Sequence, residues 1–189
     1  MPIHPTLHSS THSKLYEFVH TMAGAILLSV LVMAFVVRAF TVDGPSMMPT
    51  LQSGERLLVD RITYRLRSPQ RGEVVVFRFP SDPRQFYIKR VIGVPGDRIV
   101  ITHGRVYVNG VILDEPYTDT SVLGAFGPYT VPQDHLFMLG DNRNNSEDSR
   151  NQRVGFVAYR MVVGRALWRY WPLTRAGSLG DPKLARASS

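Results

Sequence analysis

The longest apolar run of the chain lies near its N-terminus. Residues 21–37 (TMAGAILLSVLVMAFVV) carry no charged side chain and show no polar stripe. As a helix, these 17 residues would span about 26 Å, close to the roughly 30 Å hydrocarbon core of a bilayer. Residues 39–42 lengthen the run, because the side chain of Arg38 can extend towards the headgroups. The pattern predicts a single N-terminal transmembrane anchor over residues 15–42.

Two other interpretations of this run fit the pattern less well. A cleavable signal peptide would have a shorter apolar region, and no small-residue exit site is evident before Arg38. A buried core helix would show a polar face, which is missing here. Charge does not orient the anchor, because Lys14 and Arg38 flank it on opposite sides.

Short runs rich in β-branched and aromatic residues follow the anchor, separated by turns such as Asn109-Gly110. They predict a mainly β domain of coiled antiparallel sheets over residues 43–175, with a polar loop from Asp114 to Tyr129. The segments 1–14 and 176–189 are rich in small and polar residues and predict flexible tails. The strands are expected at residues 56–59, 73–79, 86–94, 98–102, 105–108, 111–113, 135–139 and 161–170.

Composition narrows the function classes. The 189 residues include no cysteine, which excludes disulfides, a thiol nucleophile and thiolate zinc sites. The formal net charge of +7 is compatible with nucleic acid or with an anionic membrane surface. The basic residues are scattered, as at Arg65 and Arg67, which is typical of a solvated surface. We therefore expect no nucleic-acid partner.

The turn that follows the anchor holds a candidate nucleophile. Ser46 lies between Pro45 and Pro49, which fix the backbone and remove two hydrogen-bond donors. Such a turn is more often a stiff linker than a catalytic element. It would also hold a serine rigidly at a membrane surface.

A second candidate is Lys89, in the predicted strand 86–94. Alternation places Lys89 on one face with Tyr87 and Val91. A lysine at a sheet edge usually reaches solvent. If it is buried, it must pair with a carboxylate or lose its proton, and a neutral lysine can act as a general base.

The segment 140–150 (GDNRNNSEDSR) has no apolar side chain, so it is either a solvated loop or a brace for a site. His103 and His135 belong to no catalytic motif, and no phosphate loop or metal-binding helix is evident, so we expect no metal or cofactor. Together, these residues suggest a catalytic Ser46–Lys89 dyad, in which the neutral lysine activates the serine. The backbone N–H of Ser46 would be one hydrogen-bond donor to the oxyanion.

Three segments carry a resemblance to a known family. Residues 46–51 (SMMPTL), 87–97 (YIKRVIGVPGD) and 140–150 are similar to the three signature boxes of type I signal peptidases, in order and spacing. The resemblance implies a serine endopeptidase that cuts signal peptides from exported preproteins after small-x-small sites. The residue roles it implies are nucleophile for Ser46, general base for Lys89, a hydrogen bond to the lysine for Ser146, structural support for Arg90, Asp148 and Arg150, and substrate contact for Met47 and Tyr87.

The resemblance also implies partners and location. It suggests preprotein signal peptides, membrane lipid and nearby export machinery, with a single-pass protein in the plasma membrane and its catalytic domain outside. One departure is Gly44, where some members carry a serine that helps to bind the oxyanion. Two alternatives remain: a self-cleaving LexA-type protease, which would need a DNA-binding domain, and a non-catalytic membrane-tethered β domain.

Overall fold

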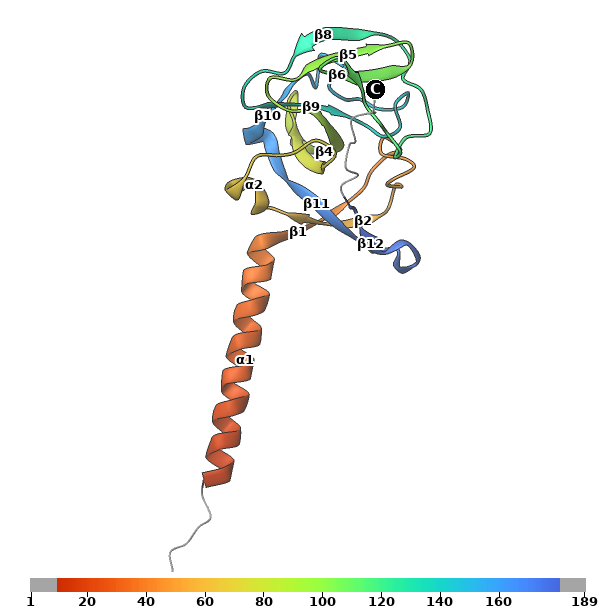
Figure 1. Ribbon diagram of the computed structural model, residues 1–189. Helices are drawn as coiled ribbons and strands as arrows, with labels where there is room; N and C mark the ends of the chain where they lie inside the picture. Colours follow the sequence, from red (N-terminus) through yellow and green to blue (C-terminus); the bar gives the residue numbers. More distant parts are fainter. Residues whose placement is uncertain (1–9, 181–189) are drawn as a thin grey trace, which may run out of the picture. The chain divides into compact units, whose positions relative to one another are not determined.

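The computed structural model describes residues 10–180, without the side chains of residues 10–13 and 31–35. The chain divides into two compact units, residues 1–36 and residues 37–189 (Figure 1). Most of the two predicted flexible tails, residues 1–9 and 181–189, lies outside the described part. The described end of the C-terminal tail is structured, because residues 177–178 form a strand and Leu179 is buried.

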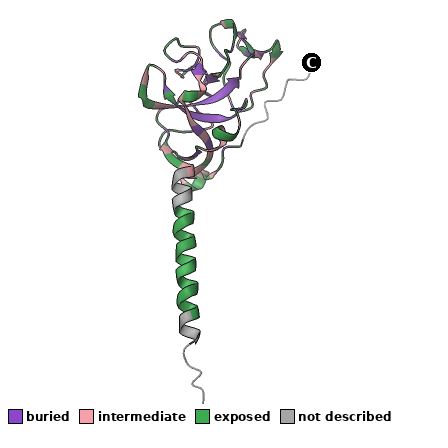
Figure 2. Cartoon of the chain, turned by 90° about the vertical axis from the view of Figure 1, so that its left-hand side faces the viewer, coloured by how far each residue is buried: buried purple, intermediate pink, exposed green. Residues whose placement is uncertain are grey.

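The described residues of the first unit form one helix, α1 (Ser10–Val36). The side chains described along it are exposed (Figure 2). Over the part of the chain that the structure describes, no helix combines the length and hydropathy of a membrane span. The helix is shorter than the predicted anchor at its C-terminal end, since residues 37–41 form strand β1.

Strand β1 (Val37–Thr41) pairs with β2 (Arg56–Asp60), from Val37 opposite Asp60 to Thr41 opposite Arg56. The sequence VRAFT is rich in β-branched and aromatic residues, which favour strands, and Val37 and Phe40 are its partly buried members. From hydropathy alone, Ala39 and Phe40 were predicted to belong to the apolar helix. This prediction was wrong, because both residues pair with β2 as part of β1.

The second unit consists of two antiparallel sheets, which confirms the expected mainly β fold. The larger sheet has the strand order β1-β2-β11-β3-β4-β9-β10, with β12 paired to β11. The smaller sheet has the order β7-β6-β5-β8. The remaining bounds are Val74–Phe79 (β3), Asp82–Gly93 (β4), Arg98–Thr102 (β5), Arg105–Val108 (β6), Val111–Ile112 (β7), Phe126–Thr130 (β8), His135–Leu139 (β9), Val157–Ala158 (β10), Val162–Trp171 (β11), Gly177–Ser178 (β12), and the short helices Thr63–Leu66 (α2), Tyr159–Met161 (η1) and Leu173–Arg175 (η2).

One strand was predicted as loop. Residues 126–130 form β8 at the edge of the smaller sheet. A proline such as Pro128 is tolerated in an edge strand, because one side of that strand has no neighbour that needs a hydrogen-bond donor. Phe126 packs against Phe137 of β9, with ring centroids 5.0 Å apart. This tertiary contact outweighs the Gly and Pro residues that made the segment look irregular.

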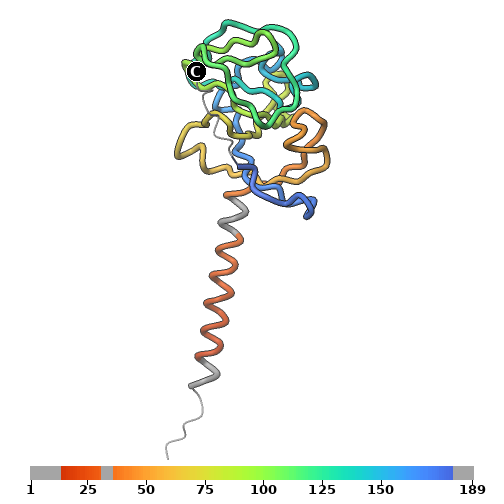
Figure 3. The backbone as a smooth tube through the Cα atoms, turned by 45° about the vertical axis from the view of Figure 1, so that its right-hand side comes forward, coloured from red at the N-terminus to blue at the C-terminus, as the bar shows by residue number. Residues whose placement is uncertain are grey.

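Two buried clusters position the segments that carry chemistry. One fills the space between the sheets and includes Ile92 of β4 together with Ile99 and Phe137. The other lies under the turn that follows β1 and includes Met47, Leu51, Leu57 and Val59. In Figure 3 this turn lies in the orange loop between β1 and β2. The larger sheet therefore supports both the candidate serine and the candidate lysine.

Gly164 marks a close approach between strands. A Cβ atom there would lie 2.2 Å from the carbonyl oxygen of Asp60 and 2.9 Å from Val59 Cγ1. We expect Gly164→Ala to lower the free energy of unfolding by about 1–3 kcal/mol, because backbone must shift to make room. Urea denaturation followed by tryptophan fluorescence measures this. Gly177→Ala is the matched control, since a Cβ there meets no atom within 4 Å, and equal stability of the two variants would contradict the expectation.

Candidate active site

The turn after β1 holds Ser46 through both backbone and core contacts. Met48 N donates to Pro45 O over 3.0 Å, and Leu51 N donates to Met47 O over 2.8 Å. Met47 and Leu51 are almost fully buried, with 1% and 0% exposure. The two hydrophobic side chains thus fix the turn on the core, and Ser46 beside them keeps a defined position.

The polar segment 140–150 packs directly against this turn. Asn142 N donates to Ser46 O over 3.1 Å, and its Nδ2 donates to Pro45 O over 3.2 Å. A Cβ at Gly140 would lie 2.4 Å from Ser46 O, so only glycine fits there. Of the two interpretations of this segment, the structure supports the brace.

The side chain of Lys89 lies next to that of Ser46 in the turn after β1. Lys89 Nζ lies 2.8 Å from Ser46 Oγ and donates to Ile88 O over 3.1 Å. Only 3% of the lysine is exposed. Burial lowers the pKa of Lys89 to about 8, against the opposing effect of the carboxylates of Asp148, Glu147 and Asp141. A substantial neutral fraction near physiological pH allows the amine to accept a proton from the serine.

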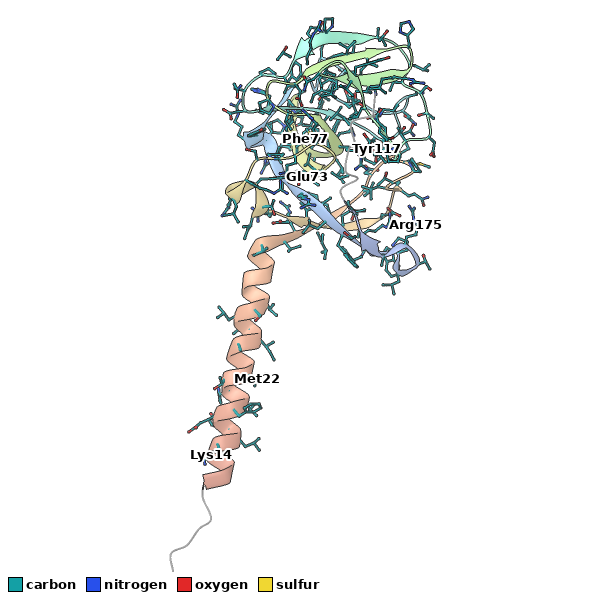
Figure 4. All side chains as sticks on the ribbon, in the orientation of Figure 1. Lys14, Met22, Glu73, Phe77, Tyr117 and Arg175 are labelled. Carbon is teal, nitrogen blue, oxygen red and sulfur yellow. The ribbon has the colours of Figure 1, made fainter. Side chains whose placement is uncertain are left out.

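Arg90, next to the lysine, forms a buried ion pair that sequence reasoning did not identify. Its Nε and Nη2 donate to the two oxygens of Asp141 over 2.8 and 2.6 Å, and the two side chains are 2% and 0% exposed. Thr50 Oγ1 also donates to Asp141, over 2.6 Å. The guanidinium lies 4.0 Å from the ring centroid of Tyr117, which is labelled in Figure 4. Arg90 thus connects the lysine strand, the serine turn and the polar segment.

Asp148 and Arg150 form a separate pair. Arg150 Nε and Nη2 each donate to the Asp148 carboxylate over 2.8 Å, and Gly140 N donates to Asp148 Oδ2 over 3.1 Å. Arg150 also donates to Arg143 O over 2.5 Å. The three supporting charges expected from the sequence therefore belong to two ion pairs, each closing a different part of the segment.

Further buried charges come from a distant loop. Arg143 is buried and donates to both oxygens of Glu115, over 2.7 Å for Nη1. Glu115 lies in a stretch that has no periodicity, so no sequence signal linked it to Arg143. A sequence signal did exist for Asp141, because it follows Gly140 at the start of the polar segment that the sequence analysis singled out.

Ser146 does not form the hydrogen bond that the resemblance implied. Its Oγ is buried and has no hydrogen-bond partner among the described residues, so it does not hydrogen-bond to Lys89. A Cβ at Gly140 would lie 2.2 Å from this oxygen, which shows how tightly the serine packs against the backbone.

A cavity of about 520 Å³ lies in front of the serine and the lysine. Tyr87 and Met47 both line it, although Met47 also belongs to the core. Tyr87 stacks on Phe79 and donates to Glu147 Oε2 over 2.7 Å. The remaining lining residues come from residues 40–43, residues 85–88 and Glu147.

Two backbone edges border this cavity. Among the described strands, β1 pairs only with β2, and residues 86–88 of β4 pair only with β3. Unpaired edges can accept an added strand through backbone hydrogen bonds. The arrangement thus offers an extended peptide two backbone edges beside a serine and a buried lysine of lowered pKa.

Comparison with known proteins agrees with this chemistry. The family model described as "Signal peptidase, peptidase S26" matches residues 15–171. The chain belongs to the signal peptidase family. It is therefore a serine endopeptidase.

Curated relatives cover most of the chain. It is 44% identical over 171 residues to probable signal peptidase I-2 of Synechocystis, covering 87% of this chain and 77% of that one. It is 39% identical over 178 residues to signal peptidase I of Leptolyngbya laminosa, covering 90% and 86%. A crystal structure of a signal peptidase I from Enterococcus faecalis is 32% identical, with a TM-score of 0.46 over 52% of this chain and 97% of that chain.

The buried Arg90–Asp141 pair yields a stability prediction for this signal peptidase. Arg90→Ala should lower the free energy of unfolding by about 3–5 kcal/mol, because Asp141 is left as an uncompensated buried charge. Urea denaturation measures the effect. Arg84→Ala is the control, since the Arg84 side chain is 91% exposed and its removal should leave the urea midpoint nearly unchanged. Equal midpoints for the two variants would refute the assignment.

Proposed function

We propose that the protein is a membrane-bound type I signal peptidase that removes N-terminal signal peptides from exported preproteins. It cuts after small-x-small sites such as Ala-x-Ala, with Ser46 as nucleophile and Lys89 as general base. The 2.8 Å separation of Ser46 Oγ and Lys89 Nζ carries the proposal. The signal peptidase I relatives supply the substrate class.

The proton transfers follow from the position of the lysine. Neutral Lys89 takes the hydroxyl proton as Ser46 Oγ attacks the carbonyl carbon of the scissile bond. The resulting ammonium gives that proton to the departing amine, which leaves as the new N-terminus of the mature protein. Lys89, neutral again, then takes a proton from water as the water oxygen attacks the acyl-serine carbonyl carbon. The ester bond to Ser46 Oγ breaks, the ammonium returns the proton to Ser46 Oγ, and the signal peptide leaves with a new C-terminal carboxylate.

The oxyanion is held by backbone. The N–H of Ser46 is one donor to the developing negative charge. At Gly44, a Cβ would meet no protein atom within 4 Å. Glycine at this position leaves room for the substrate backbone to approach, in place of the serine hydroxyl that some members carry.

The cavity supports recognition of an extended chain. The signal peptide lies between the backbone of residues 40–43 and that of residues 85–88, pairing as a β-strand. Alternate side chains of a strand point to the same face, so the first and third residues before the cut face the enzyme together. Met47 and Tyr87 line the cavity in which these two side chains are placed.

The membrane assignment rests on the apolar run within α1. Residues 21–36 of this run anchor the chain once in the plasma membrane, with the catalytic domain on the extracytoplasmic side. Membrane lipid and the export machinery are then its neighbours, and signal peptides are presented close to Ser46. No metal or cofactor enters the proposed reaction.

The dyad makes a direct prediction. Ser46→Ala and Lys89→Ala should each lower kcat/KM for a preprotein ending its signal peptide in Ala-x-Ala by a factor of about 10⁴ or more. Mass spectrometry of the products from detergent-solubilised enzyme locates the cut. Circular dichroism confirms that both variants are folded. Near-normal cleavage by folded Lys89→Ala would eliminate the dyad.

The same experiment separates the two alternatives. A non-catalytic β domain would leave the preprotein uncut even as wild type. A self-cleaving LexA-type protease would shorten its own chain during incubation, which the mass of the enzyme itself reveals.

The lysine also predicts the pH dependence. Because only the neutral amine accepts a proton, kcat/KM should fall about tenfold for each pH unit below the Lys89 pKa of about 8. Glu147 raises this pKa, so Glu147→Gln should move the acid limb to lower pH. Asp119→Asn, an exposed acid-to-amide change on a loop remote in sequence, is the control. A rate that stays flat down to pH 5 would be incompatible with a lysine base.

A further inference from the structure

One end of the larger sheet gathers basic side chains beside the first residue of the second unit. Val37 pairs with Asp60 of β2, and Asp60 pairs with Arg165 of β11. Directly after Asp60 the chain turns into α2 (Thr63–Leu66). The α2 turn thus lies at the sheet end where β1 begins (Figure 1).

Charge at this sheet end is strongly one-sided. Residues 60–67 contain three arginines, Arg61, Arg65 and Arg67, and a single acid, Asp60. The Asp60 carboxylate is occupied by Ile62 N at 2.7 Å and by Thr63 N at 3.2 Å. The other nearby acid, Glu73, labelled in Figure 4, is 1% exposed and pairs with Arg67 and Arg165. Arg61 and Arg65 remain exposed.

A large apolar side chain projects from the same turn. Leu66 is 82% exposed, the highest value among the large hydrophobic side chains that the structure describes. Single exposed leucines are common and need no explanation. Here, however, Leu66 lies between Arg65 and Arg67, and an apolar tip with arginines around it is the composition of segments that lie in a lipid interface.

We propose that residues 61–67 form a docking surface for anionic lipid headgroups, with Arg61 and Arg65 facing phosphate groups and Leu66 reaching the acyl boundary. This rests on the proposed function in one respect, namely that the chain leaves the bilayer just before Val37. Membrane is favoured over a soluble partner because the surface lies at that same sheet end. The contact fixes how far the Ser46 turn is from the membrane.

A single-cysteine probe tests this in the full-length protein. The chain has no cysteine, so Leu66→Cys accepts one environment-sensitive fluorophore at the proposed contact. In vesicles containing phosphatidylglycerol its emission should shift to the blue relative to phosphatidylcholine vesicles. About 1 M salt should reverse the shift, because the Debye length then falls to about 3 Å. The matched probe Leu123→Cys, 74% exposed on a different loop, should report no lipid difference.

Charge variants identify the source of the effect. In the Leu66→Cys background, Arg61→Gln with Arg65→Gln should weaken docking about 30-fold and abolish the lipid difference. Arg98→Gln with Arg105→Gln removes the same charge from exposed positions of the smaller sheet and should leave the lipid difference intact. An equal response in both lipids, or equal loss in the two double variants, overturns the proposal. A response to soluble polyglutamate but to neither vesicle type would assign the surface to an acidic protein instead.

Failure of the two proposals can be told apart. Preprotein cleavage in detergent, dependent on Ser46, tests the enzymatic function without any bilayer, and the arginine variants should cleave normally there. If added protein does not stay with phosphatidylcholine vesicles, the anchor is refuted, and the probe's preference for phosphatidylglycerol vesicles still decides the docking surface.

Discussion

The arrangement of the site depends on the energetic cost of burying the Lys89 amine beside Ser46, because that cost favours the neutral amine. Lys89 is nearly excluded from water, and its lowered pKa reflects that desolvation. Two buried carboxylates close by, Asp141 and Asp148, would restore the charge if they paired with the lysine. They are instead held by Arg90 and Arg150. The arginines therefore protect the neutral state of the lysine as well as the geometry of the site.

That arrangement makes stability and reactivity depend on the same contacts. Arg90 bonds to Asp141 and to the carbonyl of Gly72, while Asp141 accepts from Thr50 in the serine turn. Gly140 allows the polar segment to approach Ser46 O closely. Loss of one connection would both loosen the fold and change the surroundings of the nucleophile.

The acids and the arginines of this domain are distributed differently. Glu55, Glu73, Asp97 and Asp141 are almost fully buried, each paired with an arginine. Arg90 and Arg143 are themselves buried, whereas other arginines, such as Arg61 and Arg65, are exposed.

The sequence by itself determined the β class, most strand positions, the rigid serine turn and the pairing of Ser46 with Lys89 as candidates, because these depend on local pattern and on motifs in fixed order. It did not determine that residues 37–41 leave the apolar run to form β1, or that Phe126 turns a Gly- and Pro-containing loop into β8. Nor did it assign Asp141 to Arg90 or Glu115 to Arg143, and it implied a Ser146–Lys89 hydrogen bond that the structure does not form. Those outcomes depend on which strands become neighbours and which side chains lose water together, and only the tertiary structure decides that.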